Sequence, residues 1–157
     1  MKEIPVLFEN EDILALDKPE GLVSNARQGA GGVVPDARGG RSGRLFVVHR
    51  LDKEVSGVLV LAKTAAAHGF LNDAFSRGEV RKTYLAMIPG AVAWETVIVD
   101  KPLREFGSGR MGVDEARGKP SRTEFEVAER LEAATLLRVR PLTGRRHQIR
   151  VHLYSLG

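Results

Sequence analysis

The sequence predicts a single α+β domain over residues 1–157 that is mainly β, with its strands joined in antiparallel hairpins. A chain of 157 residues that is 43% hydrophobic can bury one substantial core, and we do not expect it to hold two. Short apolar runs alternate with glycine- and proline-containing turns, which is typical of strands. Two segments have apolar residues at helical spacing, so a few helices should flank the sheet.

The apolar runs give the order of the strands along the chain. They predict strands at residues 6–8, 13–16, 45–48, 58–61, 80–88, 91–99, 124–131 and 134–139. The first two should form a hairpin, and Pro89 with Gly90 should join the fifth and sixth in another. The run at 58–61 is nearly continuous, as expected for a strand buried on both faces. Residues 107–119 are predicted to form a loop or an irregular hairpin.

Two helices are expected from their end signals. Thr64 can cap the first, and Gly78 can supply the left-handed residue at its end. Thr143 can cap the second, with its cations close to the positively polarised N-terminus. The apolar side of this second helix would consist of Ile149, Leu153 and Leu156, and another side of Arg146, Arg150 and Tyr154.

Charge is distributed unevenly along a chain whose net charge is +4. Arginines cluster at residues 27–50 and again at 138–150. This clustering suits a polyanion, although exposed arginines that only solvate a surface would look the same. The glycine- and arginine-rich residues 27–44 are expected to form a mobile basic loop, or else a plain surface insertion.

Several classes of chemistry are excluded by composition and spacing. The chain has no cysteine, which removes disulfides, thiolate metal sites and cysteine nucleophiles. There is no signal peptide and no apolar run long enough for a bilayer, so we expect a cytoplasmic protein without a membrane partner. A hydrolase is disfavoured because Asp52 lacks a second carboxylate at suitable spacing and no serine lies in a nucleophile-elbow pattern. His147 and His152 lack the spacing and the glutamate of a zincin metal site.

Three segments hold side chains able to perform chemistry or bind a polyanion. They are HRLDKEVSG at residues 49–57, RKTYLA at 81–86 and LTGRRHQIRVHL at 142–153. Each also has an ordinary structural interpretation: Asp52 as a turn residue, Tyr84 as strand packing, and the last segment as a solvated basic helix face. Their combination and order favour a shared function.

Together, these segments resemble the motifs of the RluA-type pseudouridine synthases. That family has an HRLD-x-x-[TS]-SG motif, a K-x-Y-x-A motif and a TGR-x-HQ-[IL]-R-VH motif, and all three are matched here in order. Residues 4–23, with Lys18-Pro19 and Gly21, are similar to the family's opening hairpin and its KP-x-G-x-x-V segment. The resemblance covers nearly the whole chain. It implies a mixed, mainly antiparallel pseudouridine synthase catalytic domain with a few flanking helices.

The resemblance also implies the reaction and the catalytic residues. Uridine in a ribosomal or transfer RNA stem-loop would be isomerised to pseudouridine, with no cofactor and no metal. Asp52 would be the catalytic carboxylate, which either attacks the ribose or removes a sugar proton. Arg150 would pair with Asp52 and keep it ionised, and Tyr84 would stack on the base.

RNA contacts are implied as well. A stacked base cannot reach a carboxylate, so the target should be flipped out, and Arg50 would fill the gap. The residues expected to contact substrate RNA are His49, Arg50, Arg145, Arg146 and His147. A monomer is expected.

Two departures from the family pattern bear on activity. Val55 stands where a threonine or another small polar residue is usual. The family normally continues beyond the third motif, so the C-terminal segment is expected to be missing here, and a preceding S4-like domain is not expected either. An RNA-binding, catalytically inactive remnant of the family is therefore the alternative function.

Overall fold

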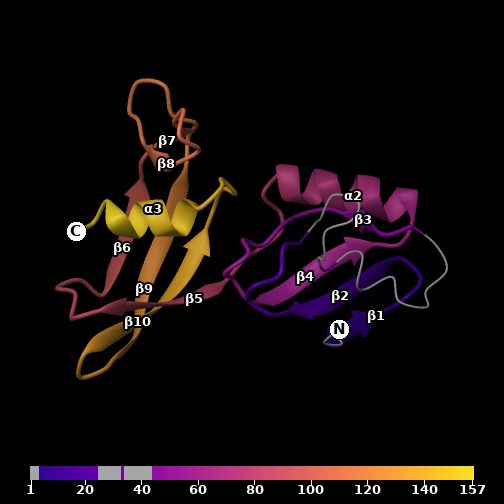
Figure 1. Cartoon of the computed structure of the whole chain (residues 1–157), viewed down its shortest axis with the longest axis horizontal. Helices are drawn as coiled ribbons and strands as arrows, with labels where there is room; N and C mark the ends of the chain where they lie inside the picture. Colours follow the sequence, from indigo (N-terminus) through magenta and orange to yellow (C-terminus); the bar gives the residue numbers. More distant parts are fainter. Residues whose placement is uncertain (1–3, 25–32, 34–43) are drawn as a thin grey trace. The chain divides into compact units, whose positions relative to one another are not determined.

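The computed structural model describes residues 4–24, 33 and 44–157. The chain forms two compact units, Met1–Glu79 and Val80–Gly157. Each unit contains a four-stranded antiparallel sheet, its own hydrophobic core and a helix against the sheet (Figure 1). The predicted α+β, mainly antiparallel architecture is confirmed. The basic loop expected at residues 27–44 lies almost entirely outside the described residues.

The first unit is built on a sheet with the strand order β1-β2-β4-β3. Its elements are β1 (Val6–Glu9), β2 (Ile13–Lys18), β3 (Phe46–Val47), β4 (Gly57–Ala62) and α2 (Ala65–Ser76). Alternate residues of β2 and β4 point to one face, where Leu14, Leu16, Leu59 and Leu61 are almost fully buried. Pairing of β1 with β2 confirms the predicted opening hairpin.

Burial of β4 on both faces was expected and is wrong at one end of the strand. Val58 is 56% exposed, whereas Ala62, which points to the same face, is fully buried. Phe46, the pairing partner of Ala62, stacks on His68 of α2 with 5.0 Å between ring centroids. The helix therefore covers this face near the end of β4 and leaves its beginning open.

Both end signals of α2 act as predicted. The Thr64 side chain accepts a hydrogen bond from the Ala67 amide, which is 3.1 Å away. At the other end Gly78 has φ +73°, and its amide donates to the carbonyl of Phe75. The amide of Glu79 donates to the carbonyl of Ala74, which completes a Schellman motif.

The second unit has a sheet with the strand order β5-β10-β9-β6. Its strands are β5 (Tyr84–Pro89), β6 (Thr96–Asp100), β9 (Arg122–Arg130) and β10 (Ala134–Pro141), with β7 (Leu103–Glu105) and β8 (Met111–Val113) in a separate hairpin. The core contains Val99, Phe125, Leu137 and Val139. Helix α3 (Gln148–Tyr154) lies across the sheet and adds Ile149 and Leu153 to this core (Figure 1).

A hairpin of the fifth and sixth strands was predicted, and it is wrong. β5 pairs with β10, and β6 pairs with β9, so β5 and β6 lie at opposite edges of the sheet. After Pro89 the chain is held to the β9–β10 turn, because the amide of Gly90 donates to the carbonyl of Ala133 and the Thr135 hydroxyl donates to the carbonyl of Gly90. These two bonds direct the chain across the end of the sheet instead of back along β5.

The last helix starts later than Thr143, so the predicted cap is also wrong. α3 begins at Gln148, and its N-cap residue is His147. The Thr143 hydroxyl instead accepts from the Arg122 amide and donates to the Gln148 side chain, which keeps residues 143–147 as a loop. Residues 107–119, expected to form a loop or an irregular hairpin, contain β8 and the turn before it, and β8 pairs with β7 in a hairpin that begins earlier, at Leu103. Among the residues that the structure describes, every helix is too short or too polar to span a bilayer.

Candidate active site

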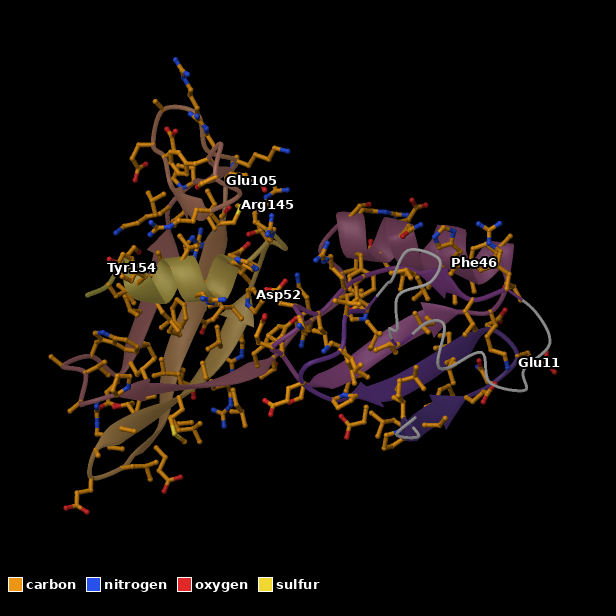
Figure 2. The ribbon with its side chains drawn as sticks, in the orientation of Figure 1. Glu11, Phe46, Asp52, Glu105, Arg145 and Tyr154 are labelled. Atoms are coloured by element: carbon orange, nitrogen blue, oxygen red, sulfur yellow. The ribbon has the colours of Figure 1, made fainter. Side chains whose placement is uncertain are left out.

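Asp52 lies in the loop that connects β3 to β4 in the first unit. It sits at one end of that unit's sheet, and Glu11, in the β1–β2 turn, lies at the other end (Figure 2). Its carbonyl accepts a 3.1 Å hydrogen bond from the Val55 amide, so residues 52–55 form a turn. The residue is half-buried, while its neighbour Arg50 is exposed. A half-buried carboxylate at a strand end is accessible to a substrate yet held by the fold.

The residue before Asp52 is fixed by one buried hydroxyl. Ser24 is 3% exposed, and its Oγ donates to the carbonyl of Leu51 at 2.8 Å and accepts from the amide of Leu51 at 3.0 Å. A single side chain thus satisfies both backbone groups of Leu51, as a neighbouring strand would. The backbone leading into Asp52 is consequently constrained.

The residue after Asp52 is fixed by the opening segment. The carbonyl of Lys53 accepts from the amide of Gly21 at 2.8 Å and from Nζ of Lys18 at 3.3 Å. Lys18 is fully buried, and burial lowers the pKa of its ammonium group, while the carboxylates of Glu54 and Asp52 act in the opposite direction. The Lys18 ammonium therefore interacts electrostatically with Asp52, and its hydrogen bond to Lys53 attaches the Asp52 loop to the end of β2.

His49 serves the fold of this unit. Its Nε2 accepts a 2.9 Å hydrogen bond from the Val60 amide of β4, where the two-residue strand β3 has already ended. Its ring stacks on Phe75 of α2 with 4.9 Å between centroids. The ring therefore extends the sheet by one hydrogen bond and anchors the start of the Asp52 loop. Contact of His49 with RNA stays a prediction.

Lys18 and Ser24 were not among the candidate residues proposed from the sequence. Lys18 continues the alternation of the buried Leu14 and Leu16 in β2, so the period of two indicated a buried lysine. That signal was available in the sequence. Ser24 had none, because its partner Leu51 is 27 residues away.

Tyr84 begins β5 in the second unit and pairs with Val139 of β10. It is half-buried and packs against the core cluster that contains Phe125 and Val139. Its ring is thus held in place by ordinary strand packing, the structural interpretation that the sequence also allowed. Stacking of Tyr84 on a base stays a prediction.

The third motif forms the loop 143–147 followed by α3. Arg145 and Arg146 are exposed, and Nη1 of Arg146 lies 2.8 Å from Oε1 of Glu105. In Figure 2 the labelled Glu105 and Arg145 lie near the start of α3, and Tyr154 lies at its far end. Nζ of Lys82 donates to the carbonyl of Thr143 at 3.1 Å, and burial lowers the pKa of this lysine. The loop is therefore attached to the residues just before β5.

His147, at the end of this loop, has a left-handed backbone with φ 52° and ψ 22°. Residues with a Cβ adopt this region rarely and at a cost of roughly 1 kcal/mol or more. Strain of this kind is concentrated at functional sites. It supports a functional interpretation of the loop.

The predicted site residues are thus divided between the two units. His49, Arg50 and Asp52 belong to the first, and Tyr84, Arg145, Arg146, His147 and Arg150 belong to the second. Within the second unit, Arg150 is exposed on α3, whereas Arg146 lies in the loop before the helix and not on the helix side predicted to carry both. The pairing of Arg150 with Asp52 remains a prediction. In the described part of the chain, no group of three or more acidic or histidine side chains is arranged to hold a metal ion.

Comparison with known proteins agrees with this arrangement of motifs. Residues 12–155 match the family model described as RNA pseudouridylate synthase. The chain belongs to this family. Ribosomal large subunit pseudouridine synthase C of Pasteurella multocida (strain Pm70) is 40% identical over 166 residues, which cover 99% of this chain and 49% of that protein. The protein of the same name in Escherichia coli (strain K12) is 39% identical over 158 residues, covering 97% of this chain and 50% of that protein.

Solved structures show the same similarity in three dimensions. Human RNA pseudouridylate synthase domain containing 1 matches with a TM-score of 0.84 and 28% identity, covering 98% of this chain and 65% of that chain. Human RNA pseudouridylate synthase domain containing 4 matches with a TM-score of 0.79 and 25% identity, over 94% of this chain and 62% of that chain. The RluA-type resemblance of the motifs is confirmed. The chain spans about half the length of the curated relatives it matches.

Proposed function

We propose that this chain isomerises uridine to pseudouridine in structured RNA, with Asp52 as the catalytic carboxylate and without a cofactor. The observation that carries the proposal is the position of the family's motif aspartate. Asp52 lies in a turn whose flanking residues, Leu51 and Lys53, are both held by buried groups of the opening segment. Such a turn can present a carboxylate in a defined direction, which a covalent or proton-abstracting step requires.

The proposed reaction needs one carboxylate and a closed site. In one route Asp52 attacks C1′ of the ribose, so that an ester bond to C1′ forms as the bond from C1′ to N1 of uracil breaks. In the other route Asp52 removes a sugar proton as that bond breaks, and it returns the proton at the end. The uracil turns and a bond forms between C1′ and C5, which displaces the carboxylate of Asp52 in the first route; the proton on C5 then leaves, and N1 gains a proton. Tyr84 would stack on the base during the rotation, and Arg150 would hold Asp52 in its ionised form.

Names of the relatives suggest where to look for the substrate. The two bacterial relatives carry the words ribosomal large subunit in their names. We therefore propose large-subunit ribosomal RNA as the first substrate to test, with transfer RNA as the second. We also propose that the protein acts as a monomer in the cytoplasm. Sedimentation of the purified protein measures its oligomeric state.

The test is incubation of the purified protein with unmodified ribosomal and transfer RNA transcripts, followed by mapping of pseudouridine. We expect signal at defined uridines with the parent protein and loss of that signal with Asp52→Ala. Binding of RNA should persist in Asp52→Ala, because one uncharged side chain replaces a carboxylate that repels phosphate. Asp73→Ala is the matched control, since Asp73 is an exposed aspartate of α2 in the same unit.

Two results would contradict the proposal. Turnover by Asp52→Ala equal to that of the parent would remove Asp52 from the catalytic role. RNA binding by a folded parent protein with no pseudouridine at any site would favour the inactive, RNA-binding alternative.

A further inference from the structure

A row of hydrogen-bonded side chains connects the 143–147 loop to the interior of the second unit. The Thr143 hydroxyl lies 2.7 Å from Oε1 of Gln148, and Nε2 of Gln148 lies 2.9 Å from Oγ1 of Thr123. Oγ1 of Thr123 lies 2.8 Å from Nδ1 of His152, and Nε2 of His152 lies 3.0 Å from the carbonyl oxygen of Lys101. The row thus joins the loop, α3, β9 and the residue after β6.

The carbonyl at the end of the row determines the donors and acceptors in it when His152 is neutral. A carbonyl only accepts, so Nε2 of His152 carries a proton, and in the neutral ring Nδ1 accepts from the Thr123 hydroxyl. Thr123 is then free to accept from the Gln148 amide nitrogen. The same amide nitrogen also donates to the carbonyl of Arg122 at 3.0 Å, and this orientation leaves Oε1 of Gln148 to accept from the Thr143 hydroxyl and from the Arg145 amide, 2.9 Å away. The backbone of Arg145 is therefore held by the side chain of Gln148, which Thr123 joins to His152.

The middle of the row is buried, which makes it costly to disturb. Thr123 and His152 are fully buried, and Gln148 is 4% exposed. A buried polar group that loses its partner cannot recover the bond from water, so removal of one member weakens the whole row. Burial also lowers the pKa of His152, which favours its neutral form.

We infer that Thr123, Gln148 and His152 are positioning residues that hold the 143–147 loop in its RNA-binding shape. The loop carries Arg145, Arg146 and His147, the residues expected to contact RNA, and His147 adopts a strained left-handed conformation there. The hydrogen bonds of the row offset the energetic cost of this strained conformation. The functional half of the inference rests on the proposed function, whereas the structural half does not.

The sheet of the same unit offers a matched pair of variants. Thr123→Val removes the hydroxyl in the middle of the row and preserves the shape of the side chain. Thr135→Val removes another fully buried hydroxyl, which donates to the carbonyl of Gly90 at 2.7 Å. Thr123 pairs with Pro141 at the end of β10, whereas Thr135 lies near the beginning of that strand, away from the row. Thr123→Ser keeps the hydroxyl and should restore the parent behaviour, which a merely volume-dependent effect would not do.

The experiment measures amide hydrogen exchange at Arg145 and RNA affinity in all four proteins, well below their unfolding temperatures. In Thr123→Val we expect the Arg145 amide to exchange at least about tenfold faster than in the parent. We also expect the Kd for RNA to rise on the order of tenfold, the effect of losing one hydrogen bond to a phosphate oxygen. Thr123→Ser and Thr135→Val should match the parent in both measurements. Nitrogen chemical shifts of His152 in the parent should show a proton on Nε2 alone.

The possible failures are distinguishable. Unchanged exchange at Arg145 in Thr123→Val, or a proton on Nδ1 of His152, would overturn the inference whatever happens to RNA binding. Faster exchange with unchanged RNA affinity would overturn the assignment of the row to RNA contact. A parent protein that binds no RNA would refute the proposed function, and the exchange measurement would still decide whether the row holds the loop.

Discussion

At the scale of single residues, the turn that carries Asp52 depends on Ser24. The hydroxyl of Ser24 bonds to both the amide and the carbonyl of Leu51, so Ser24→Ala leaves two buried backbone groups without this partner. We expect the free energy of unfolding to fall by about 1–3 kcal/mol and turnover to fall with little change in RNA affinity. Urea denaturation and single-turnover kinetics measure the two effects.

Ser56→Ala is the control for this prediction, because Ser56 is an exposed serine of the same loop. It should leave the unfolding free energy within about 0.5 kcal/mol of the parent value. Equal stability and turnover in Ser24→Ala and Ser56→Ala would mean that Ser24 does not control the Asp52 turn.

At the scale of elements, two glycines of the α2 region should respond to alanine in opposite directions. Neither has an atom within 4 Å of the position where a Cβ would be placed, so packing does not contribute. Gly69 lies inside the helix, where alanine should stabilise by about 0.5–1 kcal/mol. Gly78 has φ +73°, where alanine should destabilise by roughly 1 kcal/mol or more. Thermal denaturation of the two variants tests this, and shifts of the same sign would contradict the roles given to the two positions.

The second prediction at this scale concerns the anchorage of α3 and pH. The pKa of His152 in the folded protein lies below its ordinary value of 6.5, chiefly because of burial, with Lys101 lowering it further and the Lys101 carbonyl and Asp100 acting in the opposite direction. The unfolded chain therefore binds the proton more readily, and stability is lost as pH falls through 6.5 towards the folded-state pKa. The full contribution is present above pH 6.5.

Urea midpoints between pH 8 and pH 5 test this dependence. The parent should lose stability over the lower part of the range, and His152→Gln should show a flatter profile despite a lower stability throughout. Parallel profiles for the two proteins would assign the pH dependence to other groups.

At the scale of the whole molecule, the net charge of +4 should make RNA binding depend on salt. Each arginine that contacts a phosphate releases a counterion, so replacing one should reduce the slope of log K against log salt by roughly 0.7–0.9. We expect this reduction in Arg145→Gln and in Arg146→Gln. Arg77→Gln, at the exposed end of α2, lowers the net charge by the same one unit and should leave the slope at the parent value.

Filter-binding titrations at several salt concentrations measure these slopes. Equal slopes in Arg145→Gln, Arg146→Gln and Arg77→Gln would show that the charge of the whole protein attracts RNA, with no special part for the 143–147 loop.

Local patterns in the sequence determined much of the fold. The opening hairpin of β1 with β2 and both ends of α2 depend on neighbours within a few residues, and they were predicted correctly. The motif order also led to the family, because long motifs preserve residue types that the chemistry needs. These features share one physical reason: each is specified by contacts or conformations close along the chain.

Tertiary structure decided what depends on residues far apart. β5 and β6 were expected to pair because they follow one another, yet β5 pairs with β10 and β6 pairs with β9. Thr143 has the side chain of a helix cap, but its hydroxyl accepts from the Arg122 amide and donates to the Gln148 side chain instead. Ser24 and Thr123 became recognisable as supports only when their partners, 27 and 29 residues away, were brought to them. A hydroxyl bonds to whichever buried group the fold places beside it, and no local pattern specifies that group.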